Sequence, residues 1–181
     1  ETFALSITTP KGVIFTSADF KIDHTPAIDL PADLAKIARI GTEGVKLYIG
    51  DSLGSQRPGF AISEKVIGQN LEKVIKDAKG RLVISTFASN VGRVIQIIES
   101  AARLGKVVFL SGRSMIGYTE VAAELGYIRV PEGVIRKIES GDINSLPDDK
   151  IIILSTGAQG EEFSALARMS RDEFQYFKLK L

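Results

Sequence analysis

Four turns in the sequence place small polar residues where they can bind an anion. Each turn follows a run of apolar, often β-branched residues, and three of them also open a helix-like stretch. Ligands of α/β proteins bind at the carboxyl ends of parallel strands, and the free N–H groups at a helix start attract negative charge. These residue types therefore predict a site for a phosphate-bearing or polyanionic ligand. The four turns are 50–52, 86–90, 111–114 and 155–160.

Phe87 and Arg113 carry the most specific chemistry in these turns. A phenylalanine ring can stack on a nucleobase, which contributes about 1–3 kcal/mol per base, although an apolar residue at a strand end is more often part of the core. A guanidinium at a helix start can bind a phosphate, or can form an internal salt bridge that ties its loop down. The other polar side chains can contact the ligand or serve in turns and helix caps. These are Ser89, Asn90, Ser114 and Gln159, with the hydroxyls of Ser155 and Thr156.

The elements that position these turns alternate between strand and helix from residue 45 onward. Each predicted strand is continuously apolar, which is typical of a buried parallel sheet covered by helices on both faces. The pattern therefore predicts an α/β fold with a doubly wound, Rossmann-like sheet. Strands are predicted at 45–49, 82–86, 107–110, 151–154 and 174–181. Helices are predicted at 63–78, 90–105, 114–126 and 161–169, capped at Ser63, Asn90 and Ser114, with a helical turn or two at 134–138.

The first 44 residues do not follow this alternation, and they predict a separate segment. Residues 3–8 alternate apolar and polar side chains, and 13–15 form a short apolar run. The turn that joins them, 9–12, has proline at its second position and glycine at its end, which favours a β-hairpin. Residues 34–40 place apolar side chains at the spacing of a short amphipathic helix.

Composition narrows the class of protein without identifying a partner. A chain of 181 residues with net charge +1 has no global attraction for nucleic acid or membrane, so the field that binds a polyanion must be local. The absence of cysteine, of an apolar membrane-spanning stretch and of a visible signal peptide predicts a cytoplasmic protein that binds no membrane. The chain begins with Glu1 rather than methionine, which suggests an excised or processed segment. His24 is the only histidine and is interpreted as a solvated loop residue.

Six segments, taken in order, resemble the ribonuclease J-like branch of the metallo-β-lactamase/β-CASP nuclease family. The resemblance covers essentially the whole chain. It implies that residues 1–44 are the last part of a metallo-β-lactamase domain and that 45–181 are an incomplete β-CASP domain. The segments are DFKID at 19–23, DS at 51–52, PGFAISE at 58–64, TFASN at 86–90, GRSM at 112–115 and TGAQGE at 156–161.

The resemblance also implies a metal centre to which this chain contributes little. Members of the family bind two zinc ions, partly through an HxHxDH motif that this sequence lacks. Only Asp19 matches a family metal ligand, in Ser17-Ala18-Asp19 where the family has threonine-glycine-aspartate, and it can instead be a loop or cap carboxylate. One carboxylate does not hold zinc, so we expect no stably bound zinc in this chain alone. Asp51 matches the family's acidic motif near the metals, which implies a catalytic role, with capping of the next turn as the alternative.

Together these features predict the RNA-binding portion of a metal-dependent ribonuclease. The family hydrolyses RNA phosphodiesters as an endonuclease, a 5′ exonuclease or both, and its matching phenylalanine is implied to stack on RNA near the 5′ end. We expect the partner to be single-stranded RNA, which can carry a 5′-monophosphate, and the sequence does not distinguish it from single-stranded DNA. The longer protein can form a homo-oligomer, and we expect no activity from this chain alone. Two alternatives stay open: a non-catalytic nucleotide or sugar-phosphate binding module of doubly wound type, and a structural dimerisation segment.

Overall fold

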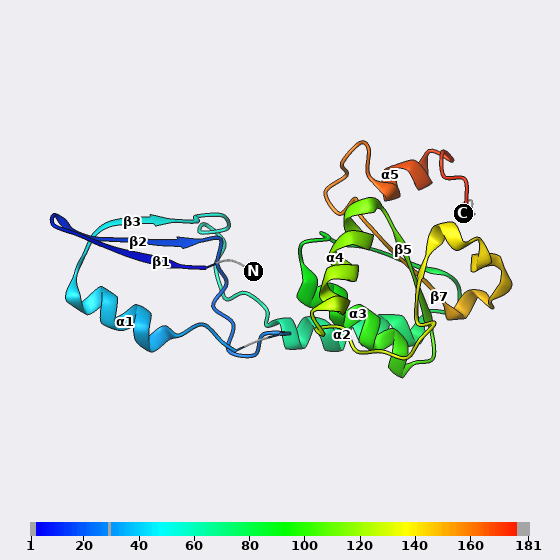
Figure 1. The fold of residues 1–181 in the computed structure, drawn as a ribbon, viewed down its shortest axis with the longest axis horizontal. Coiled ribbons are helices and arrows are strands. Elements are labelled where there is room, and N and C mark those ends of the chain that lie inside the picture. Colours follow the sequence, from blue (N-terminus) through cyan, green and yellow to red (C-terminus); the bar gives the residue numbers. More distant parts are fainter. Residues whose placement is uncertain (1–2, 29, 177–181) are drawn as a thin grey trace. The chain divides into compact units, whose positions relative to one another are not determined.

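The computed structural model describes residues 3–28 and 30–176. The chain divides into two compact units, Glu1–Lys65 and Val66–Leu181 (Figure 1). None of the helices in the described ranges is long and apolar enough to cross a bilayer.

The first unit is built on a three-stranded sheet in the order β1-β2-β3. Strands β1 (Leu5–Thr9) and β2 (Gly12–Ala18) form the predicted hairpin, with Leu5 opposite Thr16 and Thr9 opposite Gly12. Helix α1 (Leu34–Glu43) then leads to β3 (Val45–Gly50), which lies parallel to β2 (Figure 1). The Asp33 carboxylate caps α1 by accepting the Lys36 N–H at 2.9 Å.

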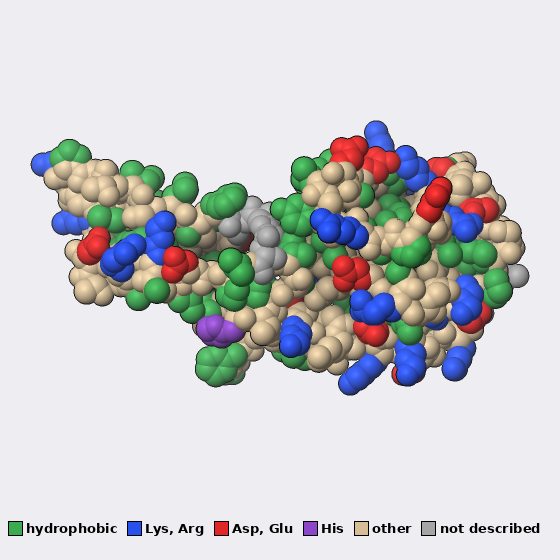
Figure 2. Space-filling model, turned by 60° about the horizontal axis from the view of Figure 1, so that its bottom comes forward, with side chains coloured by type: hydrophobic (Ala, Val, Ile, Leu, Met, Phe, Trp, Pro, Cys, Tyr) green, Lys and Arg blue, Asp and Glu red, His purple; other side chains and the backbone are tan. Residues whose placement is uncertain are grey.

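The position of β3 differs from the sequence prediction. Its strand conformation is confirmed, but it pairs with β2 in the first unit and its apolar side chains are exposed rather than buried. Apolar side chains are accordingly visible on the surface of this unit in Figure 2. An apolar run predicts a strand but not its partner, and here α1 acts as the crossover that returns the chain beside β2. The compact units thus divide after Lys65, whereas the sequence predicted a boundary after residue 44. The assignment of 1–44 and 45–181 to the two named domains stays a prediction.

The second unit has a four-stranded, all-parallel sheet in the order β4-β7-β5-β6, as predicted for an α/β fold. The strands are β4 (Leu82–Ser85), β5 (Val107–Ser111), β6 (Ile135–Lys137) and β7 (Ile151–Ser155). The flanking helices are α2 (Glu64–Asp77), α3 (Val91–Arg103), α4 (Arg113–Glu124) and α5 (Ala165–Ser170). Short 3₁₀ turns occupy Ile138–Ser140, Asp142–Ser145 and Asp148–Lys150.

The strand register aligns the carboxyl ends of three neighbouring strands. Ser155 of β7 lies opposite Ser85 of β4 on one side and Ser111 of β5 on the other. Behind this edge, Phe109 and Ile153 are fully buried in a core that continues to Met169 of α5. The loops that follow the three serines therefore leave the sheet at the same edge.

Four predicted elements differ in the second unit. Residues 135–138 form β6 and the start of a 3₁₀ turn rather than an α-helix, because Ile135–Lys137 pair with β5. Helix α4 is capped at Gly112, so Ser114 lies inside the helix, and α5 begins after Ser164 rather than at Glu161. Most of the strand predicted at 174–181 lies outside the described residues, and 174–176 are not in a strand.

Candidate functional site

A pocket of about 340 Å³ lies at the carboxyl ends of the strands of the second unit. It is formed by the loops after β4 and β7 and by the first turns of α4, so three of the four predicted turns converge. The lining residues are Thr86, Phe87, Ala88, Ser89, Ser114, Tyr118, Thr156, Glu161 and Ser164.

The fourth predicted turn does not line this pocket, because it follows β3 in the first unit. Its Asp51 side chain accepts a hydrogen bond from the Leu53 N–H at 2.8 Å, which is the geometry of an Asx turn. The capping alternative for Asp51 is therefore observed. Its predicted role near a metal centre stays a prediction.

Two aromatic rings are exposed in the pocket of the second unit. Phe87 is 45% exposed, so the alternative that it belongs to the core is wrong. Tyr118 is 49% exposed, although the sequence interpretation assigned it to packing. Tyr118 follows Ser114 by four residues, which places both on one face of α4, and this spacing is the signal that the sequence analysis overlooked.

The hydroxyl and amide side chains predicted for the site divide into two groups. Ser89 and Ser114 are exposed and line the pocket. Asn90 instead caps α3, since its side chain accepts the Arg93 N–H at 3.2 Å. Gln159 is exposed but does not line the pocket, and its backbone N–H donates to Glu161 Oε2 at 3.1 Å.

Arg113 is exposed at the first position of α4 and does not line the pocket. No ion pair found within the described ranges includes it, so the internal salt bridge considered from the sequence is not observed. The N-terminus of α4 has no side-chain cap, because its capping residue is Gly112. A Cβ at Gly112, whose φ is +104°, would lie 3.1 Å from Thr156 Oγ1, so the close approach of the two loops requires glycine.

Two buried hydroxyls lie at the ends of strands whose following segments form the pocket. Ser111 and Ser155 end β5 and β7, and both side chains are almost completely buried. Within the described part of the chain, neither Oγ has a hydrogen-bond partner. An unpaired buried hydroxyl costs stability, so these two serines are not explained by packing.

The charge of the pocket is not that of a phosphate site. Among the described residues, its lining includes one carboxylate, Glu161, and neither lysine nor arginine. Over the second unit, the face shown in Figure 2 carries basic side chains interspersed with acidic ones, without one continuous basic area. The local positive field expected from the sequence is therefore not provided by side chains that line the pocket.

Asp19 lies in the first unit, on a separate pocket of about 410 Å³. Phe15 and Tyr48 also line this pocket and stack with ring centroids 6.1 Å apart. Within residues 3–28 and 30–176, no three His, Cys, Asp or Glu side chains are grouped as a metal site. A zinc centre needs about four protein or water ligands, so the residues described here do not by themselves fit one. The role of Asp19 as a ligand in a longer protein stays a prediction.

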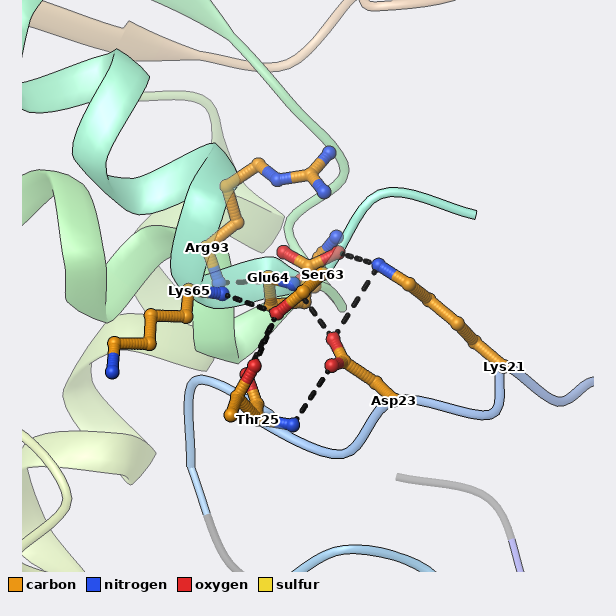
Figure 3. Close-up of polar contacts among 8 residues, drawn as sticks. Lys21, Asp23, Thr25, Ser63, Glu64, Lys65 and Arg93 are labelled. Atoms are coloured by element: carbon orange, nitrogen blue, oxygen red, sulfur yellow. Dashed lines mark hydrogen bonds and ion pairs between the residues drawn. The ribbon is translucent and has the colours of Figure 1, made fainter. Parts of the chain in front are cut away.

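The strongest polar network of the first unit surrounds Asp23 (Figure 3). The Asp23 carboxylate accepts the Glu64 N–H at 2.6 Å and the Thr25 N–H at 3.0 Å, which lowers the pKa of Asp23 to about 2. Ser63 Oγ accepts the Lys65 N–H at 3.2 Å, as expected for the predicted cap. Ser63 Oγ also lies 2.6 Å from Thr25 Oγ1. The backbone N–H groups at the start of α2 thus have side-chain acceptors from two segments that are distant in sequence.

Comparison with known proteins gives one matching family model and many similar sequences. The model that describes the β-CASP domain of ribonuclease J matches residues 79–181. Ribonuclease J of Helicobacter pylori strain 26695 is 41% identical over 177 residues, which are 98% of this chain and 25% of that protein. The Mycolicibacterium smegmatis protein of the same name is 40% identical over 97% of this chain and 31% of its own length. That of Thermus thermophilus is 40% identical over 91% of this chain and 28% of its own length.

Proposed function

This chain belongs to the ribonuclease J family through its β-CASP domain, and from that premise we propose that it forms the RNA-binding portion of a ribonuclease. The supporting observation is the exposed ring of Phe87 in a hydroxyl-lined pocket at the carboxyl ends of β4 and β7. Aromatic rings in such positions stack on unpaired bases, while neighbouring hydroxyls form hydrogen bonds with base edges and sugar hydroxyls. The substrate is therefore single-stranded RNA rather than a duplex.

In the proposed function the second unit holds RNA through residues of two elements, the loop after β4 and helix α4. Phe87 and Ser89 come from the loop after β4, and Ser114 from α4. Arg113, exposed beside the uncapped start of α4, neutralises a phosphate outside the pocket. Asn90 and Gln159 act indirectly, by holding the α3 cap and the loop of Glu161.

Catalysis in this proposal belongs to a longer protein, because the chain spans only about a quarter to a third of the relatives compared above. Two zinc ions would supply an activated water for phosphodiester hydrolysis, with Asp19 as one ligand and Asp51 nearby. Since the described residues do not fit a zinc centre, the isolated chain is proposed to bind RNA without cleaving it. The longer protein is proposed to be cytoplasmic.

The proposal is tested by RNA binding to the chain and its Phe87→Ala variant. Fluorescence anisotropy with a labelled single-stranded RNA should show binding that weakens as salt rises. Phe87→Ala should weaken binding by about 1–3 kcal/mol, whereas Phe87→Tyr should retain most of it. Tyr127→Ala is a matched control, because Tyr127 is equally exposed (48%) and does not line the pocket.

Two results would count against the proposal. Binding of free mononucleotides as tightly as RNA would favour the alternative of a nucleotide-binding module. Absence of salt-sensitive RNA binding would favour a structural segment. Turnover of RNA by the pure chain would contradict the proposal that catalysis requires a longer protein.

A further inference from the structure

The lining of the second-unit pocket suits a nucleobase better than a phosphate. A phosphate carries negative charge and would be repelled by Glu161, and none of the lining residues within 3–28 and 30–176 is a cation that offsets that repulsion. Two exposed rings and several hydroxyls are instead the groups that bind a planar, hydrogen-bonding molecule. The lining therefore fits a base, and the phosphates of a bound RNA are expected to lie outside the pocket.

Tyr118 lines the pocket from outside the buried face of α4. The side of α4 that faces the core carries Met115, Thr119 and Ala122, which are buried. Tyr118 lies off this face, on that of Ser114, and is half-exposed. A large aromatic ring that leaves half of its surface exposed beside a pocket is available to stack on a ligand.

Glu161 is held in place by its own loop. Its Oε2 accepts the Gln159 N–H at 3.1 Å, which orients the carboxylate. The hydrogen bonds found within the described ranges leave Oε1 without a partner of its own. An ionised carboxylate only accepts hydrogen bonds, so it selects a base whose edge donates.

We infer that Tyr118 and Glu161 form a base-recognition subsite that selects guanine within the RNA-binding wall. Guanine presents two adjacent donors, the N1 hydrogen and the N2 amino group, whereas adenine and cytosine each present one amino group beside an acceptor. Phe87 and Tyr118 come from two different walls, the loop after β4 and helix α4, and stack on this base. The inference rests on the proposed function, because it names which base the RNA-binding pocket takes.

The first experiment measures base preference of the unmodified chain. Labelled oligouridylates that carry a single interior guanosine, adenosine or abasic residue are compared by anisotropy at low salt. Guanosine should strengthen binding roughly tenfold over adenosine, as expected for one well-placed carboxylate contact to a base edge. Adenosine should in turn bind more tightly than the abasic residue, because the rings stack on either purine.

The second experiment separates the two side chains. Tyr118→Ala should weaken binding of the guanosine RNA about tenfold and leave binding of the abasic RNA unchanged, while Tyr118→Phe keeps its affinity. Glu161→Gln keeps an oxygen that can accept the Gln159 N–H, so it should reduce the guanosine preference without reducing binding of the abasic RNA. Tyr127→Ala serves again as the control. A double variant, Phe87→Ala with Tyr118→Ala, should be less damaging than the product of the single effects if both rings contact one base.

The outcomes distinguish this inference from the proposed function. Salt-sensitive binding of all RNAs with equal affinity, unchanged by Tyr118→Ala and Glu161→Gln, would overturn the subsite while the RNA-binding proposal stands. A preference for adenosine or uridine would overturn the role of Glu161. No salt-sensitive binding to any RNA would instead overturn the proposed function itself.

Discussion

Helices α2 and α4 begin in opposite ways. At the start of α2, the Asp23 carboxylate and Ser63 hydroxyl accept the first backbone N–H groups, and Lys21 pairs with Glu64 at 2.9 Å. At the start of α4, Gly112 provides no side-chain acceptor. The first four N–H groups of a helix need partners from elsewhere, and side chains supply them at one start but not at the other.

The two helix starts show where this chain uses polar residues for stability and where it leaves them free to contact a ligand. Around α2 nearly every polar group near the helix start is paired within the first unit (Figure 3). Around the pocket beside α4, Ser89 and Ser114 are exposed, and the buried hydroxyls of Ser111 and Ser155 have no hydrogen-bond partner in the part of the chain that the structure describes. We therefore expect substitutions around α2 to change stability, and those around the pocket to change binding unless they alter the backbone.

The largest effect is expected where the pocket depends on its backbone. Gly157 has φ +118°, and a Cβ there would lie 2.6 Å from Ser164 Oγ and 2.8 Å from Leu166 Cβ. Gly157→Ala should therefore destabilise the second unit by about 3 kcal/mol, through backbone strain and a clash that buried Ser164 cannot relieve. Urea unfolding measures this change. Gly160→Ala is the matched control, since Gly160 has φ +74° with no atom near its Cβ position, and should cost only about 1 kcal/mol.

The next largest effect on stability should come from removing the Asp23 charge at the start of α2. Asp23→Asn removes the charge that the Glu64 and Thr25 N–H groups stabilise. Because the pKa of Asp23 is lowered to about 2 in the folded chain, its stabilisation is complete above its ordinary pKa and is lost as pH falls toward 2. The variant should thus be less stable than the original at neutral pH, and the difference should shrink between about pH 4 and pH 2. Urea midpoints measured across this range test it; a difference independent of pH would contradict the assignment.

A smaller effect, of opposite sign, is expected from the unpaired hydroxyls behind the pocket. Ser155→Ala should stabilise the second unit by about 1 kcal/mol, because it removes a buried hydroxyl that has no partner within the described ranges. Ser100→Ala is the control, since buried Ser100 accepts a hydrogen bond from Arg103 at 3.1 Å and its loss should be destabilising. Thermal unfolding shows whether each variant is more or less stable than the original chain. A destabilised Ser155→Ala would show that the hydroxyl has a partner, such as an internal water.

The smallest effect concerns the residue before Asp19. Ala18 has φ +50°, a conformation that favours glycine, at the position where the family pattern has glycine. Ala18→Gly should therefore stabilise the first unit by about 0.5 kcal/mol, because relief of strain exceeds the added entropy of the unfolded chain. Ala38→Gly, inside helix α1, should instead cost about 1 kcal/mol. Equal losses in both variants would show that Ala18 is not strained.

Local patterns predicted most elements but not their partners. The hairpin, α1, α2 and α3 follow from turn residues, caps and helical spacing, which act within a few residues. The sheet that β3 joins and the strand at Ile135–Lys137 depend on pairing across long distances in the chain, which no local pattern encodes. For the site, strand-end turns predicted Phe87, Ser89 and Ser114 in one pocket. They did not predict Tyr118, because local sequence does not indicate that an aromatic residue within a helix is exposed.

The strand order has a consequence for how the second unit assembles during synthesis. Strand β7 lies between β4 and β5, which are neighbours in sequence but not in the sheet. A nascent chain that has not yet reached Ile151 therefore contains two apolar strands with no bridge between them. Closing the sheet must wait for late, non-local contacts, which is slow compared with helix formation. A ribosome-bound chain released before Ile151 should consequently be captured by chaperones and cleaved by proteases, whereas one extended through α5 should resist both.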